Sequence, residues 1–301
     1  MPAITPAMSR MFVGNVRLVP APRRASPRAD APPVELRGTD PQALVVGAGL
    51  IAAADTVPAA TRQDIVDCTL FAQLAATAAA GGTEDVGPWY RAYFGALTAL
   101  GWAQSDTRFE RYEFAGRNAE AHQAVLRVLT ALLGPHAAAL AIVKAAIDAL
   151  QSMNENRPWL TLFEQESKTA GSARFQVAAA DIEASELLQV ALVGFSLKAE
   201  SQITQVLFFK CGSSAASLEY AAGRATIYEA ALAGVRATIA TRLTDYRRAM
   251  IGEIALPGSP LKLLAPARDA RPAPASQGLP PGVPPLSPGS SPARVVRALL
   301  S

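Results

Sequence analysis

Proline is concentrated at the two ends of the chain, and this confines the foldable part to the middle. Residues 1–38 contain repeated Pro and Arg without a sustained period, and residues 257–301 include the runs PGSP, PAPASQG and LPPGVPPLSPGSSPA. Proline fixes φ and has no amide donor, so neither a helix nor a sheet propagates through such segments. We therefore expect two disordered tails on either side of a single domain at residues 39–256.

The composition provides enough apolar material for one core. Half of the 301 residues are hydrophobic and only 18% are charged. A stretch of some two hundred residues with this balance buries a substantial interior without a metal or a disulfide framework. The two cysteines are also too few for a disulfide-stabilised secreted fold.

The first half of this domain has the pattern of helices. Thr61 and Asp64 resemble a capping box, apolar residues follow at helical spacing, and Gly81 ends the segment. A second helix is expected to begin at Pro88 and to end at Gly101.

Two more helices are expected between Asn118 and Pro158, separated by Gly134 and Pro135. Between Gly101 and Asn118, the segment RFERYEF has the aromatic content of a short strand.

The pattern becomes extended after Pro158. Short segments with strand character follow one another at turn distances, and they predict an antiparallel meander: WLTLFEQES, ARFQVAAADI, LLQVALVGFSLKAE, ITQVLFFKC and SLEYAA. A last helical stripe at Ile227, Ala231, Val235, Ile239 and Leu243 is suited to cover a sheet face. The predicted fold class is α+β, with N-terminal helices packed on an antiparallel β-meander and a C-terminal covering helix.

The string ALVVGAGLIA, which contains Gly47 and Gly49, imitates a dinucleotide-binding turn. Such a site needs a strand, a helix of several turns and a second parallel strand. Pro58 and the expected helix start at Thr61 come too early for that unit. We interpret the string as close helix packing through small residues, and we expect no bound NAD, FAD or ATP.

Catalytic and metal-binding patterns are not found in the sequence. The only imidazoles, His122 and His136, both fall in helical segments, and no serine lies in a G-x-S-x-G elbow. Two distant cysteines and two distant histidines give no metal-ligand spacing, so neither a metal nor another cofactor is expected.

Two groups of carboxylates are interpreted as solvated surface rather than as an acid and base pair. They are Glu164 and Glu166 on one expected strand, and Asp181, Glu183 and Glu186 near an expected turn.

Cys211 is the one candidate for a modified or ligand-binding side chain. It follows the apolar run VLFFK and precedes GSSAAS, so its thiol is expected at the end of a strand beside an apolar interior. That position suits a thioester-linked acyl chain, and it also suits an ordinary half-buried cysteine. If an acyl chain is bound, we expect a tunnel between the sheet and the stripe of Ile227, Val235 and Ile239. Cys68, on a helix face, is interpreted as a core residue.

The charge distribution does not favour nucleic-acid binding. The net charge is only +3, and many arginines lie in the two tails. The uncharged runs at residues 41–54 and 68–83 are too short to span a bilayer, so no transmembrane segment is expected. The N-terminus has no continuous apolar stretch of the kind found in export signals. A cytoplasmic protein, or one exported without a conventional signal peptide, fits these features.

Three segments carry a resemblance to known proteins: DIVDCTLFAQLAA, PWYRAYFGALTALGW and ITQVLFFKCGSS. With these, residues 40–255 resemble a family of uncharacterised bacterial α+β proteins, a likeness that implies the fold and no activity. A fainter resemblance is to bacterial virulence-factor-like proteins that carry a fatty acid on a cysteine. This second likeness implies S-acylation, with Cys211 as the candidate position.

These features favour a non-enzymatic protein of interaction or effector type, with an unknown protein partner or a lipid. Two alternatives stay open: a lipid-carrying or membrane-associating protein acylated at Cys211, and an enzyme with a site that the sequence does not reveal.

Overall fold

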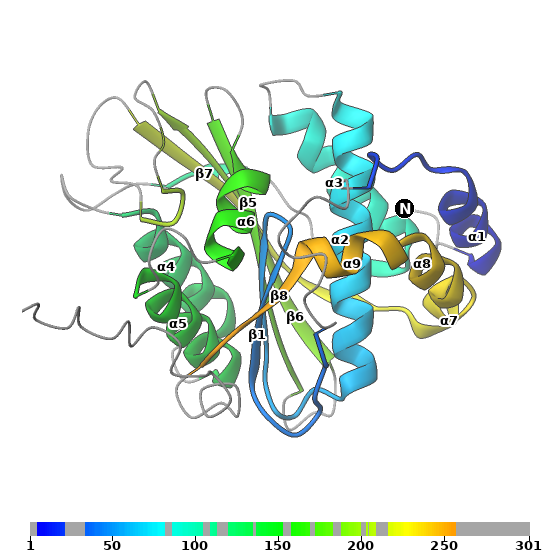
Figure 1. Ribbon diagram of the computed structural model, residues 1–301, viewed down its shortest axis with the longest axis horizontal. Helices are drawn as coiled ribbons and strands as arrows, with labels where there is room; N and C mark the ends of the chain where they lie inside the picture. The colour runs from blue at the N-terminus through cyan, green and yellow to red at the C-terminus, as the bar shows by residue number, and fades with distance from the viewer. Residues whose placement is uncertain are drawn as a thin grey trace, which may run out of the picture. The chain divides into compact units, whose positions relative to one another are not determined.

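One mixed sheet separates two layers of helices in the computed structural model (Figure 1). The structure describes residues 5–21, 34–81, 86–104, 109–112, 120–134, 137–152, 158–168, 172–182, 188–199, 203, 205–208 and 216–256. All of them belong to one unit of the chain, residues 1–263. The mixed α+β class predicted from the sequence is confirmed.

The sheet has the order β3-β7-β6-β5-β2-β1-β8, and β4 also pairs with β7. Its strands are β1 (Gln42–Val46), β2 (Gly49–Ala53), β3 (Trp102–Gln104), β4 (Glu110–Arg111), β5 (Ser172–Ile182), β6 (Leu188–Ala199), β7 (Ala216–Ile227) and β8 (Ile251–Ile254). The meander β5-β6-β7 is antiparallel, as expected, but β2 pairs with β5 in parallel. The sheet is therefore mixed, and the meander is only its central part.

Helices cover both faces of this sheet. One face carries α1 (Pro6–Asn15), α2 (Ala59–Ala80), α3 (Val86–Ala99), α7 (Glu229–Ala233), α8 (Arg236–Arg242) and α9 (Thr244–Met250). The other carries α4 (Ala121–Leu133), α5 (Ala138–Gln151) and α6 (Pro158–Ser167). Each face has its own apolar core, which explains why β5 and β6 are buried along nearly their whole length.

The glycine string forms a β-hairpin. Val46 pairs with Gly49, and Gly47 adopts a φ of 55° in the two-residue turn. The string is therefore not helical itself, although its small residues do allow α2 to approach closely. The sequence does not show the alternation of apolar and polar residues that indicates a strand with one exposed face. Helices cover both faces of the sheet here, and all ten strand residues of the hairpin are buried.

Two segments expected as strands have other structures. WLTLFEQES lies in α6, where Leu160, Phe163 and Ser167 recur at intervals of three and four residues and are buried. The described residues of ITQVLFFKC, 203 and 205–208, belong to no strand.

The expected covering helix is not one helix. It divides into α7, α8 and α9, and the chain then returns to the sheet as β8, which pairs with β1. The predicted stripe is nevertheless buried at Ala231, Val235, Ile239 and Leu243. The apolar period therefore predicted which residues are buried, but it did not predict where the helices begin and end.

Helix α2 begins earlier than the capping-box pattern predicts. It starts at Ala59 after Pro58, and no side chain caps it. Its end at Gly81, in the left-handed conformation, matches the expectation.

Helix α1 lies within residues 1–38, where the sequence predicts a disordered tail. Thr5 caps it, Val13 is fully buried, and Phe12 packs edge-on against Phe71 of α2. Residues 5–15 therefore depart from that prediction. Residues 257–301 lie outside the described part of the chain.

Helix α3 lies close to the sheet over Gly194 of β6. A Cβ at this position would be 2.5 Å from Cε1 of Tyr90. The Tyr90 hydroxyl is 2.8 Å from the carbonyl oxygen of Phe175 and 2.6 Å from that of Phe195. A glycine at 194 thus allows the ring to lie flat on the strands.

We predict that Gly194→Ala lowers the free energy of unfolding by about 1–3 kcal/mol, because the added methyl group displaces the Tyr90 ring. Gly95, on the exposed side of α3, is the matched control, since a Cβ there meets nothing within 4 Å. Gly95→Ala should stabilise by about 0.5–1 kcal/mol. Urea unfolding of both variants gives these values, and an unchanged midpoint for Gly194→Ala would contradict the described packing.

Candidate functional site

Cys211 lies outside the described residues, but the segment that leads to it is placed. Val206 and Leu207 are buried in the core on the α4–α6 side of the sheet. The stripe of Val235 and Ile239 belongs to the core on the opposite side. Val206 and Leu207 therefore lie on the opposite side of the sheet from the stripe, and the tunnel expected between the sheet and the stripe is not on their side.

His122 is next to this segment. Its backbone N–H donates to the Leu207 carbonyl oxygen at 2.7 Å, and its ring centroid is 5.5 Å from that of Phe208. Nδ1 lies 3.2 Å from the Glu120 carboxylate, without the alignment of a hydrogen bond. An imidazole and a carboxylate thus lie near the chain three residues before Cys211.

The other residues considered from the sequence have structural roles where they are described. Cys68 is fully buried, and burial raises the pKa of its thiol well above the usual range. Glu164 accepts from the Val206 N–H at 2.8 Å and pairs with Lys168. Asp181 accepts from the Thr56 hydroxyl at 2.8 Å. His136, Glu183 and Glu186 lie outside the described residues.

Gln73 of α2 holds the hairpin turn. Its side-chain oxygen accepts from the Ala48 N–H at 3.0 Å, and its amide donates to the Val46 carbonyl at 2.9 Å. A Cβ on Gly47 would be 2.5 Å from that oxygen. The glycines of the string therefore serve a turn that α2 approaches closely.

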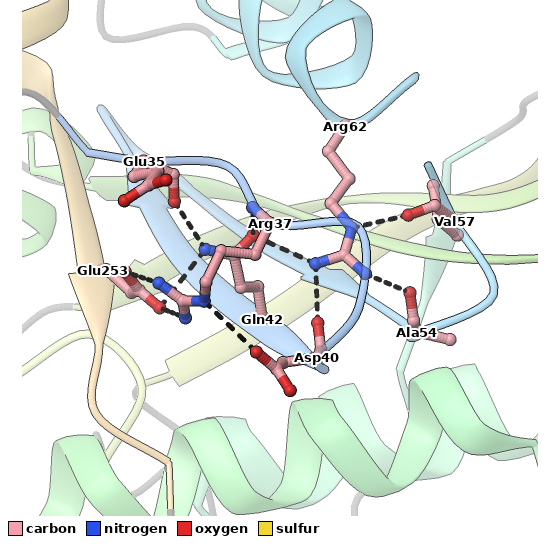
Figure 2. Close-up of polar contacts among 8 residues, drawn as sticks. All are labelled: Glu35, Arg37, Asp40, Gln42, Ala54, Val57, Arg62 and Glu253. Carbon is pink, nitrogen blue, oxygen red and sulfur yellow. Dashed lines mark hydrogen bonds and ion pairs between the residues drawn. The ribbon is translucent and has the colours of Figure 1, made fainter. Parts of the chain in front are cut away.

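A polar cluster at the start of α2 centres on Arg62, which is only 1% exposed (Figure 2). Its guanidinium donates to four oxygens at 2.7–3.0 Å: the carbonyls of Asp40, Ala54 and Val57 and the side chain of Gln42. None of these acceptors is a carboxylate. Burial lowers the pKa of Arg62, and Arg37 acts in the same direction.

Arg37 has a carboxylate partner. It forms a two-pronged ion pair with Glu253 of β8 and lies 3.6 Å from Asp40, as Figure 2 shows. Gln42 joins the two arginines, since its oxygen accepts from the Arg37 N–H and from Arg62 at 3.0 Å each. The cluster thus fastens residues 37–42, the turn at residues 54–57 and β8 to α2.

Farther along α2, two carboxylates pair with the C-terminal helices. Asp64 receives two hydrogen bonds from Arg236, at 2.7 and 2.8 Å. Asp67 pairs with Arg247 of α9. Burial raises the pKa of Asp67, and the Arg247 guanidinium opposes that rise.

The N-terminal segment is held by the same helices. Arg242 donates to the carbonyl oxygens of Val13 and Val16, and the Tyr246 hydroxyl donates to that of Val19. The outer side of α1 is open: Met8 is 45% exposed and Met11 is 63% exposed. We call Ala7, Met8, Met11 and Gly14, all exposed, the methionine face of α1.

A last group of polar side chains lacks partners. Arg174 of β5 stacks on Trp89, with its guanidinium carbon 4.7 Å from the ring centroid. Its Nε is buried and unpaired, as are the hydroxyl of Ser196 and the carboxamide of Gln176. The sequence analysis missed these residues, because a lone arginine in an otherwise apolar strand was its only signal.

No protein-family model matches the chain, and no curated protein matches it. No helix within the described ranges has both the length and the apolar content to cross a membrane. In the same part of the chain, no three His, Cys, Asp or Glu side chains converge into a metal-binding group.

Arg62→Met should lower the free energy of unfolding by about 3–5 kcal/mol, because four buried oxygens lose their donor. Arg127 is exposed on α4, so Arg127→Met is the control and should change stability by less than about 0.5 kcal/mol. Guanidinium unfolding monitored by circular dichroism compares them. Equal midpoints for the two variants would show that Arg62 does not stabilise these turns.

Proposed function

We propose that this is a non-enzymatic interaction protein that binds an acidic protein partner through the methionine face of α1. The observation that carries the proposal is the exposure of Met8 and Met11 on a helix whose other side is fixed to the domain. Large apolar side chains exposed together on one helix are typical of contact surfaces.

The anchoring of α1 supports a role in binding. Val13 is fully buried, and Arg242 holds the carbonyl oxygens beyond it. A partner therefore meets a helix that is already ordered, which lowers the entropic cost of association. Methionine side chains are flexible and polarizable, so they adapt to an apolar groove.

Charge specifies the partner further. Residues 1–29 contain five arginines and no acidic residue; Arg10 is exposed on α1 and Arg17 is exposed two residues after its end. A groove with an apolar floor and an acidic rim complements this surface, and its charge also accelerates association.

The test places a photo-crosslinking residue at Met11 in the full chain, in its own host cells. A matched probe replaces Lys144, which is exposed on α5 across the sheet. We expect one defined adduct from position 11, absent from position 144 and reduced when Arg10→Glu is added. The adduct's partner, once purified, should bind the Met8→Ser, Met11→Ser protein at least about tenfold more weakly.

Equal adducts from positions 11 and 144 would contradict the proposal. So would an unchanged affinity for the double variant, because both outcomes mean that α1 is not the contact surface.

A second candidate function is lipid carriage on Cys211. Two observations favour it: Val206 and Leu207 enter the interior, and the His122 imidazole lies beside this segment. Cys211 is three residues from Phe208, so its Cα lies within about 11 Å of that of Phe208. An acyl chain that reaches the same core would gain roughly 0.8 kcal/mol for each buried methylene.

Intact mass of the protein from its host, with and without neutral hydroxylamine, tests this second function. We expect the mass of one acyl group to be lost on treatment, because hydroxylamine cleaves thioesters. Cys211→Ser should lack that mass from the start, whereas Cys68→Ser should retain it. An unmodified wild-type mass would leave Cys211 an ordinary cysteine.

A further inference from the structure

Two methionines in the described part of the chain lie on the surface, and both belong to the methionine face. Met8 and Met11 are exposed, whereas Met250, at the end of α9, is 4% exposed and belongs to the core. An interval of three residues puts the two exposed thioethers on the same side of α1. A small neutral oxidant in water therefore reaches these two sulfur atoms, while the core shields Met250.

Hydrogen peroxide oxidises the thioether of methionine to a sulfoxide. The O–O bond of the peroxide breaks, one oxygen forms a bond to sulfur, and the other leaves as water with both protons. The sulfur loses two electrons and the peroxide gains them. The product has nearly the same length as methionine, but a strong hydrogen-bond acceptor replaces its apolar, polarizable end.

A sulfoxide does not fit the partner surface proposed above. The apolar floor of the groove offers no hydrogen bond, and burying an unpaired polar oxygen is unfavourable. The acidic rim offers carboxylate oxygens, which accept hydrogen bonds and do not donate them. Oxidised Met8 and Met11 therefore find a hydrogen-bond donor neither at the floor of the groove nor at its rim.

Oxidation leaves the attachment of α1 to the domain in place. The opposite side of the helix carries the fully buried Val13, and Arg242 donates to the Val13 carbonyl oxygen. The Thr5 cap uses the backbone N–H of Met8 and not its sulfur. The chemical change is therefore confined to the contact surface.

We propose that the methionine face is a peroxide-sensitive switch: oxidation of Met8 and Met11 to sulfoxides releases the acidic partner, and reduction restores binding. This inference rests on the proposed function and adds its regulation. Reduction by a methionine sulfoxide reductase takes two electrons from a dithiol, restores the thioether and releases the oxygen as water. Because the partner buries both sulfur atoms, its binding also protects them from oxidation.

Peptide mapping of the full chain in dilute hydrogen peroxide, by mass spectrometry, tests the chemical step without the partner. We expect sulfoxide to form at Met8 and Met11 at least about tenfold faster than at Met250. The thermal midpoint of the oxidised protein should change by less than about 2 °C. Equal rates at the three methionines, or a clearly lower midpoint, would overturn the switch, because oxidation would then not be confined to the contact surface.

Binding to the partner purified through the position-11 adduct tests the switch itself. The oxidised wild type should bind at least about tenfold more weakly, and methionine sulfoxide reductase with dithiothreitol should restore binding. The matched control is Met8→Leu, Met11→Leu, because leucine is apolar, has a similar volume and forms no sulfoxide. This variant should bind like the unoxidised wild type both before and after peroxide treatment.

The outcomes separate the switch from the proposed function. Full binding by the oxidised wild type would overturn the switch and leave the partner assigned to α1. Loss of binding by the peroxide-treated leucine variant would also overturn it, since that variant retains both cysteines and the effect would belong to another residue. If position 11 gives no defined adduct, the proposed function fails and the switch fails with it.

Discussion

The polar side chains of α2 are the constraint on which the rest of the fold depends. This helix is buried along most of its length, and four of its buried polar side chains bind other elements of the fold. Arg62 holds the segments before β1 and after β2 at the open end of the hairpin, Asp64 and Asp67 hold the C-terminal helices, and Gln73 holds the hairpin turn. Because apolar contacts have little directionality, these hydrogen bonds are what fixes the register of α2 against its neighbours.

The distance along the chain between contacting residues explains which elements of the fold the sequence predicted. The meander and helices α2–α5 follow from apolar period and from glycine and proline, which are local signals. The hairpin, β8 and the ends of α6 to α9 depend on partners far along the chain. Glu253 is an example, because the sequence predicts it at the end of a helix. In the structure it lies in β8, which pairs with β1, and its carboxylate forms an ion pair with Arg37. No local pattern distinguishes that strand from one more helical turn.

The candidate sites also differ in whether they depend on a local sequence pattern or on contacts with distant residues. Cys211 stays a prediction from the sequence, made because a cysteine after an apolar run is a recognisable chemical pattern. Helix α1 was missed because Pro6 and the surrounding prolines predict disorder, whereas Arg242, more than two hundred residues away, binds its backbone at Val13 and Tyr246 binds the segment after it at Val19.

Arg62 and Arg174 have different surroundings, although both are arginines that contact the interior of the same fold. Burial lowers the pKa of both guanidinium groups, although Arg62 is almost fully buried and Arg174 only half-buried. Around Arg62 the chain provides four oxygens, with at least one for each guanidinium nitrogen. Around Arg174 it provides an aromatic face, a hydroxyl and a carboxamide, which orient a guanidinium but do not neutralise it. Arg62 is 1% exposed and needs its four oxygens, whereas Arg174 is only half-buried and keeps part of its contact with water. The difference between the two arginines is therefore one of solvation: protein oxygens replace water around Arg62, and water still reaches part of the Arg174 side chain.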